Sequence, residues 1–501
     1  MKAQDFDVVV LGSGFAGSIA AMILQRVGRR VALIDKARHP RFAIGESSTP
    51  IANMVLRDLA RRYDLPRLVP LASYGPWQET YPHIGCGLKR GFSYFEHQRG
   101  ETFKPSPAHT NELLVAASSR DRDSDTQWLR ADVDQFLCSE AAHVGATVLE
   151  ECAVQEIHRR SVGDWIFDCR YDRQRLKLRS SFVIDSTGEA GILPRSLGIA
   201  PCVERCRTRS RAIFSHFRNV GSWHESLNWL GGCTQDHPFT CDHAAQHHIF
   251  DGAWLWMLRF NNGLTSAGLV LDEAKYPLEL SRDTSTEWDQ WLKCFPSVAA
   301  MFATAELAPS PGKLIRTARL QRRWSQFAGD DWALLPHTAG FIDPLHSTGI
   351  AHSLCGVELL VQIIEQAWRS EALAGELRRF DQTIQQELDI IDELVAICFS
   401  TFSQFELLVI ASMLYFALAT TYERLRYNNQ TPLAFLCADR PEIRELLQIA
   451  GQILREAASI DTPAAVAQVR RDITALIAPI NHVGLLDLSQ ANMYRHTVAP
   501  Q

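Results

Sequence analysis

The stretch that decides the fold is residues 7–17, DVVVLGSGFAG. A short valine-rich run passes directly into three closely spaced glycines, and an apolar pattern with helical period then continues over residues 18–27. A second apolar run at residues 31–34 ends at Asp35. The order of strand, glycine turn, helix, strand and acid predicts a Rossmann-type βαβ unit that binds a nucleotide.

Each part of this unit has a chemical reason. Glycines let backbone N–H groups approach a pyrophosphate at the amino end of a helix, where the helix dipole favours negative charge. Asp35 is placed to accept hydrogen bonds from ribose hydroxyls, and it would repel a 2′-phosphate, which disfavours NADP. The residues expected to bind the nucleotide here are Gly12, Gly14, Phe15, Ala16, Gly17, Asp35 and Lys36.

The βαβ unit alone does not separate NAD from FAD, but a later segment does. Residues 340–350, GFIDPLHSTGI, precede a second apolar helix. The amides at its start form another helix N-terminus that can face an anion or an electron-rich ring. Two such sites suit a nucleotide with a second reactive ring, and the sequence therefore favours FAD.

Composition excludes several classes of function. The 501 residues carry 51 basic and 57 acidic side chains, with no Lys/Arg run that would follow a phosphate backbone, so nucleic acid is not an expected partner. Twelve scattered cysteines without a CxxC pair indicate reduced thiols in the cytosol. Residues 1–6 lack the basic start and apolar core of a signal peptide. We expect a cytoplasmic protein.

Two further patterns give negative expectations. The densest group of candidate metal ligands fits no zinc spacing, so no metal site is expected; it comprises Cys233, His237, Cys241, His243, His247 and His248. Between Leu394 and Tyr422 the only charge is Glu406, which divides the stretch into apolar pieces shorter than the ~20 residues of a bilayer span. Buried helices without stable membrane insertion are expected there.

At this point the sequence resembles the flavin-dependent halogenase family, within the wider FAD monooxygenase and geranylgeranyl-reductase-like group. The resemblance covers roughly the first 370 residues. It depends on the glycine turn and on GESSTP (45–50), WLRAD (128–132), DSTG (185–188) and the 341–349 segment. Two further motifs are specific to halogenases: GLKRGFSY (87–94) and WLWMLR (254–259).

The resemblance implies an α/β fold with an FAD-binding Rossmann-type domain of the glutathione-reductase-2-like kind, a sheet-based substrate domain and a helical C-terminal region. The FAD-binding domain is expected to be discontinuous, with bounds 1–200 and 311–375, and part of 80–130 is expected to contribute to the substrate side. The substrate sheet is expected over 201–310. The helical region is expected over 376–501, where it could form a lid over the substrate. The further FAD-binding residues implied are Glu46, Ser47, Arg130, Val154, Asp185, Gly188, Asp343, Pro344, Gly349 and Ile350.

The resemblance also implies a mechanism. A separate NAD(P)H-dependent flavin reductase supplies FADH2, O2 adds to give a flavin peroxide, and chloride or bromide attacks it to give hypohalous acid. Lys89 then captures or orients that acid beside an electron-rich aromatic ring, free or carrier-tethered. Ser347, Thr348 and Gly349 would bind halide, and His346 would act as an acid or base. Trp254 and Trp256 would separate substrate from flavin.

The sequence departs from the family pattern at three places. Leu258 and Arg259 replace the Ile-Pro that follows the tryptophans. His346 replaces the glutamate that works with the lysine in tryptophan halogenases, which favours a phenol or pyrrole over free tryptophan. His337 stands where related flavoproteins usually have an acid, so one flavin contact is expected to be lost.

Alternatives remain open at the level of the sequence. Lys89 can equally be a surface lysine, since lysines are mostly exposed, and the two tryptophans can be core packing. Residues 347–349 can serve only to turn the chain into a helix. At the level of function, the rivals are an aromatic hydroxylase and a non-catalytic FAD-binding accessory protein.

Overall fold

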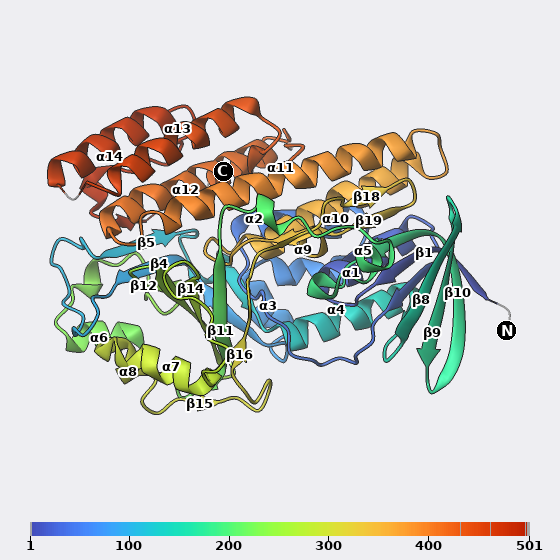
Figure 1. Cartoon of the computed structure of the whole chain (residues 1–501), viewed down its shortest axis with the longest axis horizontal. Coiled ribbons are helices and arrows are strands. Elements are labelled where there is room, and N and C mark those ends of the chain that lie inside the picture. Colours follow the sequence, from blue (N-terminus) through green and yellow to red (C-terminus); the bar gives the residue numbers. More distant parts are fainter. Residues whose placement is uncertain (1–2, 431, 461, 496, 498–501) are drawn as a thin grey trace.

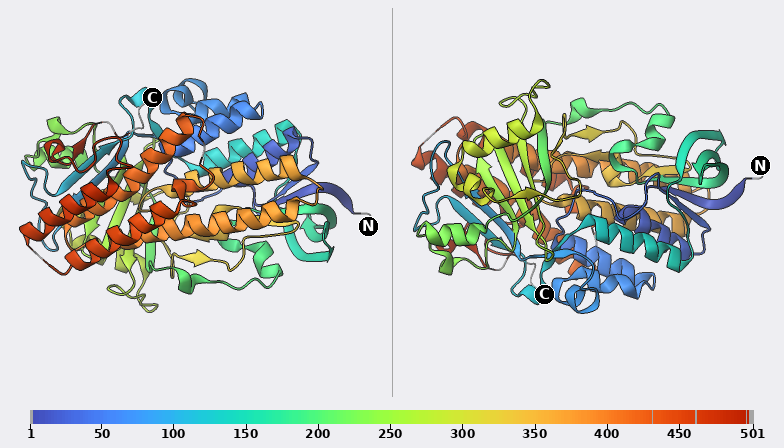
Figure 2. Two further views of the ribbon diagram at one scale, coloured as in Figure 1. Left: turned by 90° about the horizontal axis from the view of Figure 1, so that it is seen from above. Right: turned by 90° about the horizontal axis from the view of Figure 1, so that it is seen from below.

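The structure is a computed structural model that describes residues 3–430, 432–460, 462–495 and 497 (Figure 1). Met1 and Lys2, within the segment that lacks signal-peptide character, lie outside the described residues. The fold is mixed α/β, as the sequence predicts. Two large sheets lie toward opposite ends of the long axis, and long C-terminal helices lie along one side of both (Figures 1 and 2).

The first sheet contains the predicted βαβ unit. β1 (Gln4–Leu11) pairs in parallel with β2 (Val31–Ile34), and α1 (Phe15–Arg26) connects them. The valine run is fully buried because both faces of a parallel sheet are covered by other elements. The remaining strands of its main path are β7 (Thr147–Leu149), β10 (Gln174–Asp185), β19 (Trp332–Leu334) and β18 (Ala328–Gly329), in the order β18-β19-β10-β1-β2-β7.

A β-ribbon extends from this sheet. β8 (Ala153–Ser161) and β9 (Asp164–Tyr171) pair antiparallel, and β9 continues onto β10. The apolar pattern over residues 146–157 forms β7 and the start of β8. The two are separated because Glu151, at φ 55°, turns the chain, and the Cys152 N–H donates to the Asp35 carbonyl.

The second sheet is assembled from separate parts of the chain. Its order is β15-β11-β14-β13-β12-β4-β5-β21, with β16 also pairing with β11. The strands are β4 (Gly91–Glu96), β5 (Glu112–Ala116), β11 (Ser210–Arg218), β12 (Ala245–Phe250), β13 (Ala253–Arg259), β14 (Thr265–Asp272), β15 (Glu306–Leu307), β16 (Ile315–Arg316) and β21 (Met493–Tyr494). Two small ribbons pair β3 (Cys86–Lys89) with β6 (Asp125–Trp128), and β17 (Arg322–Arg323) with β20 (Gly340–Phe341).

Helices surround both sheets. Those from the N-terminal two-thirds of the chain are α2 (Pro50–Arg62), α3 (Tyr74–Thr80), α4 (Arg130–Val144), α5 (Ile192–Ser196), α6 (Trp223–Trp229), α7 (Thr284–Lys293) and α8 (Pro296–Met301). The later ones are α9 (Pro336–Ala339), α10 (Thr348–Ala367), α11 (Leu373–Phe399), α12 (Phe405–Tyr427), α13 (Pro441–Ala457) and α14 (Pro463–Ile477). Seen from above, α11 to α14 lie across the molecule (Figure 2).

Two helices are long and apolar enough to cross a membrane by length and composition alone. They are α10 and α12, and α12 is longer than expected because Glu406 lies in its first turn rather than dividing it. Within the fold, 72% of the apolar window of α10 and 94% of that of α12 are buried. Both helices therefore pack as core helices, as a soluble protein would have them.

Candidate functional site

The glycine turn between β1 and α1 holds backbone close to backbone. Gly12 has φ 94°, and a Cβ there would lie 2.5 Å from the Ser186 carbonyl oxygen. A Cβ on Gly17 would lie 2.1 Å from the Gly12 carbonyl oxygen. Gly14 differs, because its φ is −65° and a Cβ would be at an ordinary 3.5 Å from the Arg130 guanidinium. The fold thus requires Gly12 and Gly17, whereas a Cβ at Gly14 would meet only ordinary contacts.

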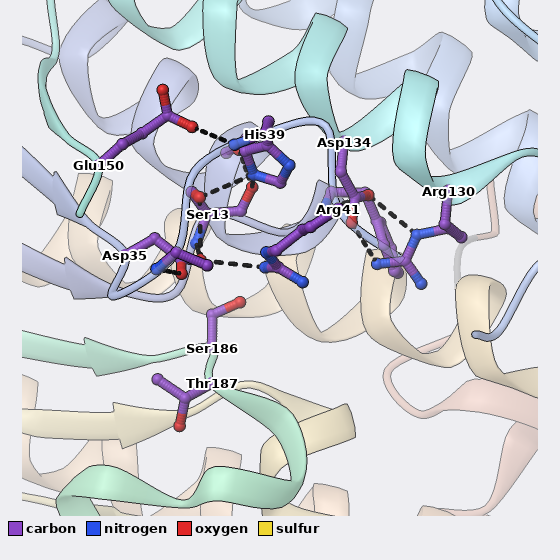
Figure 3. A network of polar contacts seen from close by, with 12 residues as sticks. Ser13, Asp35, His39, Arg41, Arg130, Asp134, Glu150, Ser186 and Thr187 are labelled. Carbon is purple, nitrogen blue, oxygen red and sulfur yellow. Dashed lines mark hydrogen bonds and ion pairs between the residues drawn. The ribbon is translucent and has the colours of Figure 1, made fainter. Parts of the chain in front are cut away.

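The acid after β2 is held by charge and hydrogen bonds (Figure 3). Asp35 Oδ2 accepts from the Ser13 N–H, the Ser13 hydroxyl and Arg41 Nη2, each at 3.0 Å. Burial alone raises the pKa of Asp35, but Arg41 and hydrogen bonds from Ala37 and Ser13 outweigh it, so the net pKa is lowered. Asp35 is ionised at neutral pH, and Lys36 beside it is exposed.

A second ion pair lies at the start of α1 (Figure 3). The Arg130 guanidinium donates to Asp134 at 2.8 and 2.9 Å and to the carbonyls of Ile44 and Gly45. Asp134 Oδ1 also accepts the Phe15 N–H at 3.1 Å. Together the glycine turn and the guanidinium groups of Arg41 and Arg130 form a cradle whose chemistry fits the pyrophosphate of a dinucleotide.

The DSTG turn is fixed by its own acid. Asp185 is fully buried and accepts from the Thr187 N–H, the Thr187 hydroxyl and the Leu193 N–H. Gly188, at φ 61°, donates its N–H to the Thr338 hydroxyl. Asp185 therefore shapes the turn beside the cradle and keeps no free oxygen pointed at a ligand, while Val154 lies half-buried at the start of β8.

His337 lies between this turn and α10. Its Nε2 is 3.2 Å from the Ser186 hydroxyl, and its Nδ1 is 3.3 Å from the Ser353 hydroxyl. Burial lowers the pKa of His337 to about 4, so the ring is neutral. The imidazole thus offers hydrogen bonds to serines where related flavoproteins offer a carboxylate.

Glu46 is buried next to the second sheet. Its Oε1 lies 2.7 Å from His216 Nε2 on β11, and its Oε2 has no hydrogen-bond partner in the described part of the chain. Ser47 follows it, and its hydroxyl also lacks a partner there. No pattern in the sequence indicates His216, because 170 residues separate it from Glu46.

Lys89 ends β3 in the interior, and its side chain is fully buried. Its Nζ donates to the Ser48 carbonyl at 2.5 Å and lies 4.1 Å from the centre of the Phe92 ring. Asp125 is directly opposite in the β3–β6 register, and its Oδ1 accepts from Asn53 at 2.6 Å. Burial lowers the pKa of Lys89 and raises that of Asp125. The charge of each residue acts against the effect of burial on the pKa of the other. The surface-lysine alternative is wrong for this fold.

Aromatic side chains gather next to Lys89. Phe92 lies edge-on to Tyr415 and Phe416, and Tyr94 stacks on His247 at 4.4 Å between ring centres. His247 also contacts Trp254 at 5.1 Å. We call this group the aromatic cluster: Phe92, Tyr94, His247, Trp254, His346, Tyr415 and Phe416. The Tyr94 hydroxyl and Trp254 Nε1 are buried with no hydrogen-bond partner among the described residues.

His346 belongs to the cluster through Tyr415. The two rings stack at 4.6 Å with 8° between their planes, and His346 Nε2 is 3.7 Å from the Cys398 thiol. Burial lowers the pKa of His346 to about 3, and its Nδ1 finds no partner within the described chain. The histidine is therefore neutral, where a tryptophan halogenase has a charged glutamate.

The turn around His346 starts α10. Ser347, at φ 53°, precedes the helix, and Thr348 and Gly349 begin it without a side-chain cap. Gly349 is exposed, and a Cβ there would meet nothing within 4 Å. Asp343 is buried and accepts from the Ser210 hydroxyl at 2.9 Å, and burial raises its pKa to about 7. Pro344 is half-buried and Ile350 fully buried.

The tryptophan motif lies on β13. Trp254 and Trp256 point to the same side of the strand with ring centres 6.0 Å apart, and Trp256 Nε1 donates to the Ser266 hydroxyl. Arg259, the departure from the family motif, donates to the carbonyls of Val220 and Gly221 and pairs with Asp242 at 3.4 Å. Arg259 thus fixes nearby loops and leaves the positions of the tryptophans intact.

Comparison with known proteins agrees with this geometry. A model of the tryptophan halogenase family matches residues 7–60 and 127–406. Monodechloroaminopyrrolnitrin halogenase PrnC of Pseudomonas fluorescens is 30% identical, over 95% of this chain and 85% of its own. The chain belongs to the tryptophan halogenase family. It is a flavin-dependent halogenase, an oxidoreductase-type enzyme that uses FAD, as the sequence predicts, and the alternative of a non-catalytic accessory protein is wrong.

Other members of the family extend the likeness. A 1H-pyrrole-2-carbonyl peptidyl-carrier-protein chlorinase of Pseudomonas fluorescens is 24% identical over 71% of this chain and 74% of its own. Halogenase PltM, solved with phloroglucinol and FAD, has a TM-score of 0.87 at 24% identity, covering 98% of this chain and 99% of that one. The PltM comparison establishes the fold, and the predicted α/β architecture with an FAD-binding domain is confirmed.

Proposed function

We propose that the enzyme halogenates an electron-rich phenol or pyrrole ring, free or carrier-tethered, with hypohalous acid that Lys89 captures or orients. The observation that carries this proposal is the buried amine of Lys89 beside the aromatic cluster. A lysine without solvent, opposite one carboxylate in the β3–β6 register and next to an aromatic ring, is unusual as a structural element, since lysines are almost never fully buried unless paired.

The cradle at the start of α1 would hold the cofactor. The N–H groups at Gly14 and Ala16 and the guanidinium groups of Arg41 and Arg130 suit its pyrophosphate, while the Phe15 N–H donates to Asp134. Asp35 suits a ribose. The other residues assigned to this site are Gly12, Gly17, Lys36, Glu46, Ser47, Val154, Asp185, Gly188, Asp343, Pro344, Gly349 and Ile350. Bound as FADH2, the cofactor would supply hypohalous acid from O2 and chloride or bromide.

The start of α10 would hold the halide. The N–H groups of Thr348 and Gly349 lie where a helix N-terminus lacks internal hydrogen-bond partners, and the absence of a side-chain cap leaves them available. The Ser347 N–H donates to the Pro344 carbonyl at 3.0 Å, so Ser347 would border the ion without donating its N–H. The space beside Gly349 admits an ion without a clash. In this proposal the halide and the cofactor would lie at the same edge of the first sheet.

Lys89 would then act on the acid. As an amine it can take the halogen and release the hydroxyl as water, and as an ammonium it can donate a hydrogen bond that polarises the O–X bond. Asp125 is the group that holds or returns the proton, because its carboxylate is the charge that acts on Lys89 in this interior. The lowered pKa makes the amine available at lower pH than in an exposed lysine.

The aromatic cluster would enclose the substrate ring. Trp254 and Trp256 would form the wall between the substrate ring and the cofactor. Tyr415 and Phe416 of α12 would cover the substrate ring as a lid. A neutral His346 provides no carboxylate for an indole substrate, so free tryptophan should not be turned over. The relatives support a phenol or pyrrole: PltM was solved with phloroglucinol, and the Pseudomonas fluorescens chlorinase is named for a carrier-bound pyrrole.

We infer an NAD(P)H-dependent flavin reductase as the partner and the cytoplasm as the location. The test uses purified enzyme with such a reductase, FAD, NADH, O2 and bromide, against phenols, pyrroles and tryptophan, with products identified by mass spectrometry. The expected result is a brominated phenol or pyrrole and unchanged tryptophan. Brominated tryptophan, or no brominated product from any phenol or pyrrole, would overturn the proposal.

A further inference from the structure

A cluster of metal-type ligands lies at the end of the molecule away from the N-terminus, apart from the cradle (Figure 1). His224 is in the first turn of α6, and His237 and Cys241 are in the loop that leads to β12. One ligand atom from each of the three lies within 4.8 Å of the others. His237 and Cys241 are buried, and His224 is half-buried.

We propose that His224, His237 and Cys241 bind a borderline-soft divalent cation, zinc above all. A thiolate with two imidazoles is a ligand set that zinc takes, and a fourth position would be left for water beside the half-buried His224. Tetrahedral zinc needs ligand atoms about 3.5 Å apart, so the side chains need to close by no more than about 1.3 Å from a separation within 4.8 Å.

The two histidines offer the nitrogen atoms that a metal needs. His224 Nδ1 and His237 Nδ1 are buried and have no hydrogen-bond partner in the described part of the chain. His237 Nε2 lies 3.0 Å from the Glu112 carboxylate. A carboxylate that accepts the Nε2–H fixes the tautomer that presents the Nδ1 lone pair, which is the usual outer arrangement at a metal-bound histidine.

The backbone around the ligands is already fixed. Asp242, next to Cys241, accepts from the Ser222 hydroxyl and from the N–H groups of Trp223 and His224. The cysteine and the first histidine are therefore tied to each other before any ion binds. Burial raises the pKa of the Cys241 thiol, so on binding the S–H bond breaks, the metal–sulfur bond forms and the proton passes to solvent.

The spacing of residues along the sequence does not indicate this group of ligands. No zinc pattern was expected because His224 lies outside the stretch in which candidate metal ligands are densest. Within the described residues, Cys233, His243, His247 and His248 belong to none of the candidate ligand groups. A second group, His109, Glu112 and His237, shares one histidine with the first but has no sulfur. The two arrangements can be told apart by whether the bound metal has a thiolate ligand.

The experiment uses the full chain with FAD bound. Zinc content is measured after desalting, and the chelator-treated protein is titrated with Co²⁺, whose thiolate charge-transfer absorption reports a sulfur ligand. We expect about one zinc ion per chain and this absorption. Cys241→Ser should abolish the absorption, and His224→Gln should weaken zinc binding at least ~10-fold. The matched control is Cys233→Ser, which should change neither.

Two outcomes would overturn the proposal. One is a wild-type protein that retains no zinc and gives no cobalt spectrum. The other is cobalt bound without the thiolate absorption, which would place the metal on His109, Glu112 and His237. Retained FAD binding shows that a variant is folded. If Cys241→Ser misfolds, the test depends on His224→Gln, because His224 is only half-buried. Unchanged zinc affinity in His224→Gln would contradict the proposed site.

Discussion

The cradle at the start of α1 and the aromatic cluster around Lys89 are built in opposite ways. The cradle comes mainly from one continuous stretch, residues 12–17, whose backbone groups form the turn that would face the pyrophosphate. The cluster gathers side chains from β4, β12, β13, the turn before α10 and α12. Substitutions in the cradle should therefore change cofactor binding, and substitutions at the cluster should change the fate of the halogen after flavin chemistry.

Lys89→Ala should separate the two regions most clearly. The variant should still bind FAD and oxidise FADH2, because the cradle is untouched, yet form at least ~10²-fold less halogenated product. The measurement is product formed per FADH2 consumed at saturating bromide. Lys89→Arg should not restore product if amine chemistry is required, since guanidinium stays protonated.

Two controls accompany this variant. Removing Lys89 leaves Asp125 buried without its cation, which is destabilising. The double variant Lys89→Met, Asp125→Asn removes both charges and keeps the volume, so it distinguishes lost chemistry from lost folding. Lys293→Ala, an exposed lysine on α7, should leave the ratio unchanged. A normal ratio in folded Lys89→Ala would mean that Lys89 is not the residue that captures or orients the hypohalous acid.

Gly14→Val should act on the cradle alone. Its φ suits any residue and its side chain would meet ordinary contacts, so the protein should fold. The same side chain fills the space where backbone meets pyrophosphate, and FAD affinity should fall at least ~10²-fold, or about 3 kcal/mol. FAD titration by fluorescence measures this. Gly17→Val is the contrast: its Cβ would overlap the Gly12 carbonyl, so it should lower Tm or prevent folding. Normal affinity in folded Gly14→Val would refute the cradle.

The same contrast explains what the sequence could and could not predict. The βαβ unit, the glycine roles and Asp35 were predictable because their contacts are local and backbone-based. Lys89 was identified by its motif, but Asp125 was not, because their pairing exists only through the β3–β6 register. Stacking of Tyr415 on His346 depends on how α12 crosses the sheet, which periodicity does not specify.

Asp125→Asn tests how far the pair depends on charge. The carboxylate raises the pKa of Lys89 against the lowering by burial, so removing it should lower that pKa further. If the amine is the reactive form, product per FADH2 rises with pH, and the midpoint of that rise should move to lower pH. If the ammonium is reactive, product is lost with rising pH, and that loss should begin at lower pH. Either shift, with yield reduced about tenfold, supports a positioning role.

A purely structural Asp125 predicts a different result. The variant would then lose stability and yield together without moving the midpoint of the pH profile. Asn53 offers a matched control, because it contacts Asp125 and not Lys89 in the structure. Asn53→Ala should reduce yield less than Asp125→Asn and shift the profile little, since it removes a hydrogen bond but no charge.

Asp35→Ala should have the smallest effect of the series. The substitution removes hydrogen bonds to one ribose, but the glycine turn and Arg130 remain, so FAD affinity should fall about tenfold or less. Asp35 also holds the Ser13 N–H and Arg41, and part of the loss should therefore come from a loosened turn. Asp35→Asn keeps one acceptor for Ser13 and should retain more affinity than alanine. The exposed Arg38 provides the control Arg38→Ala, which should bind FAD normally. Because Lys89 is not involved, product per FADH2 should stay at the wild-type value once FAD is saturating. An altered ratio at saturation would mean that the two regions are coupled, and an unchanged affinity would mean that Asp35 is not the ribose acid.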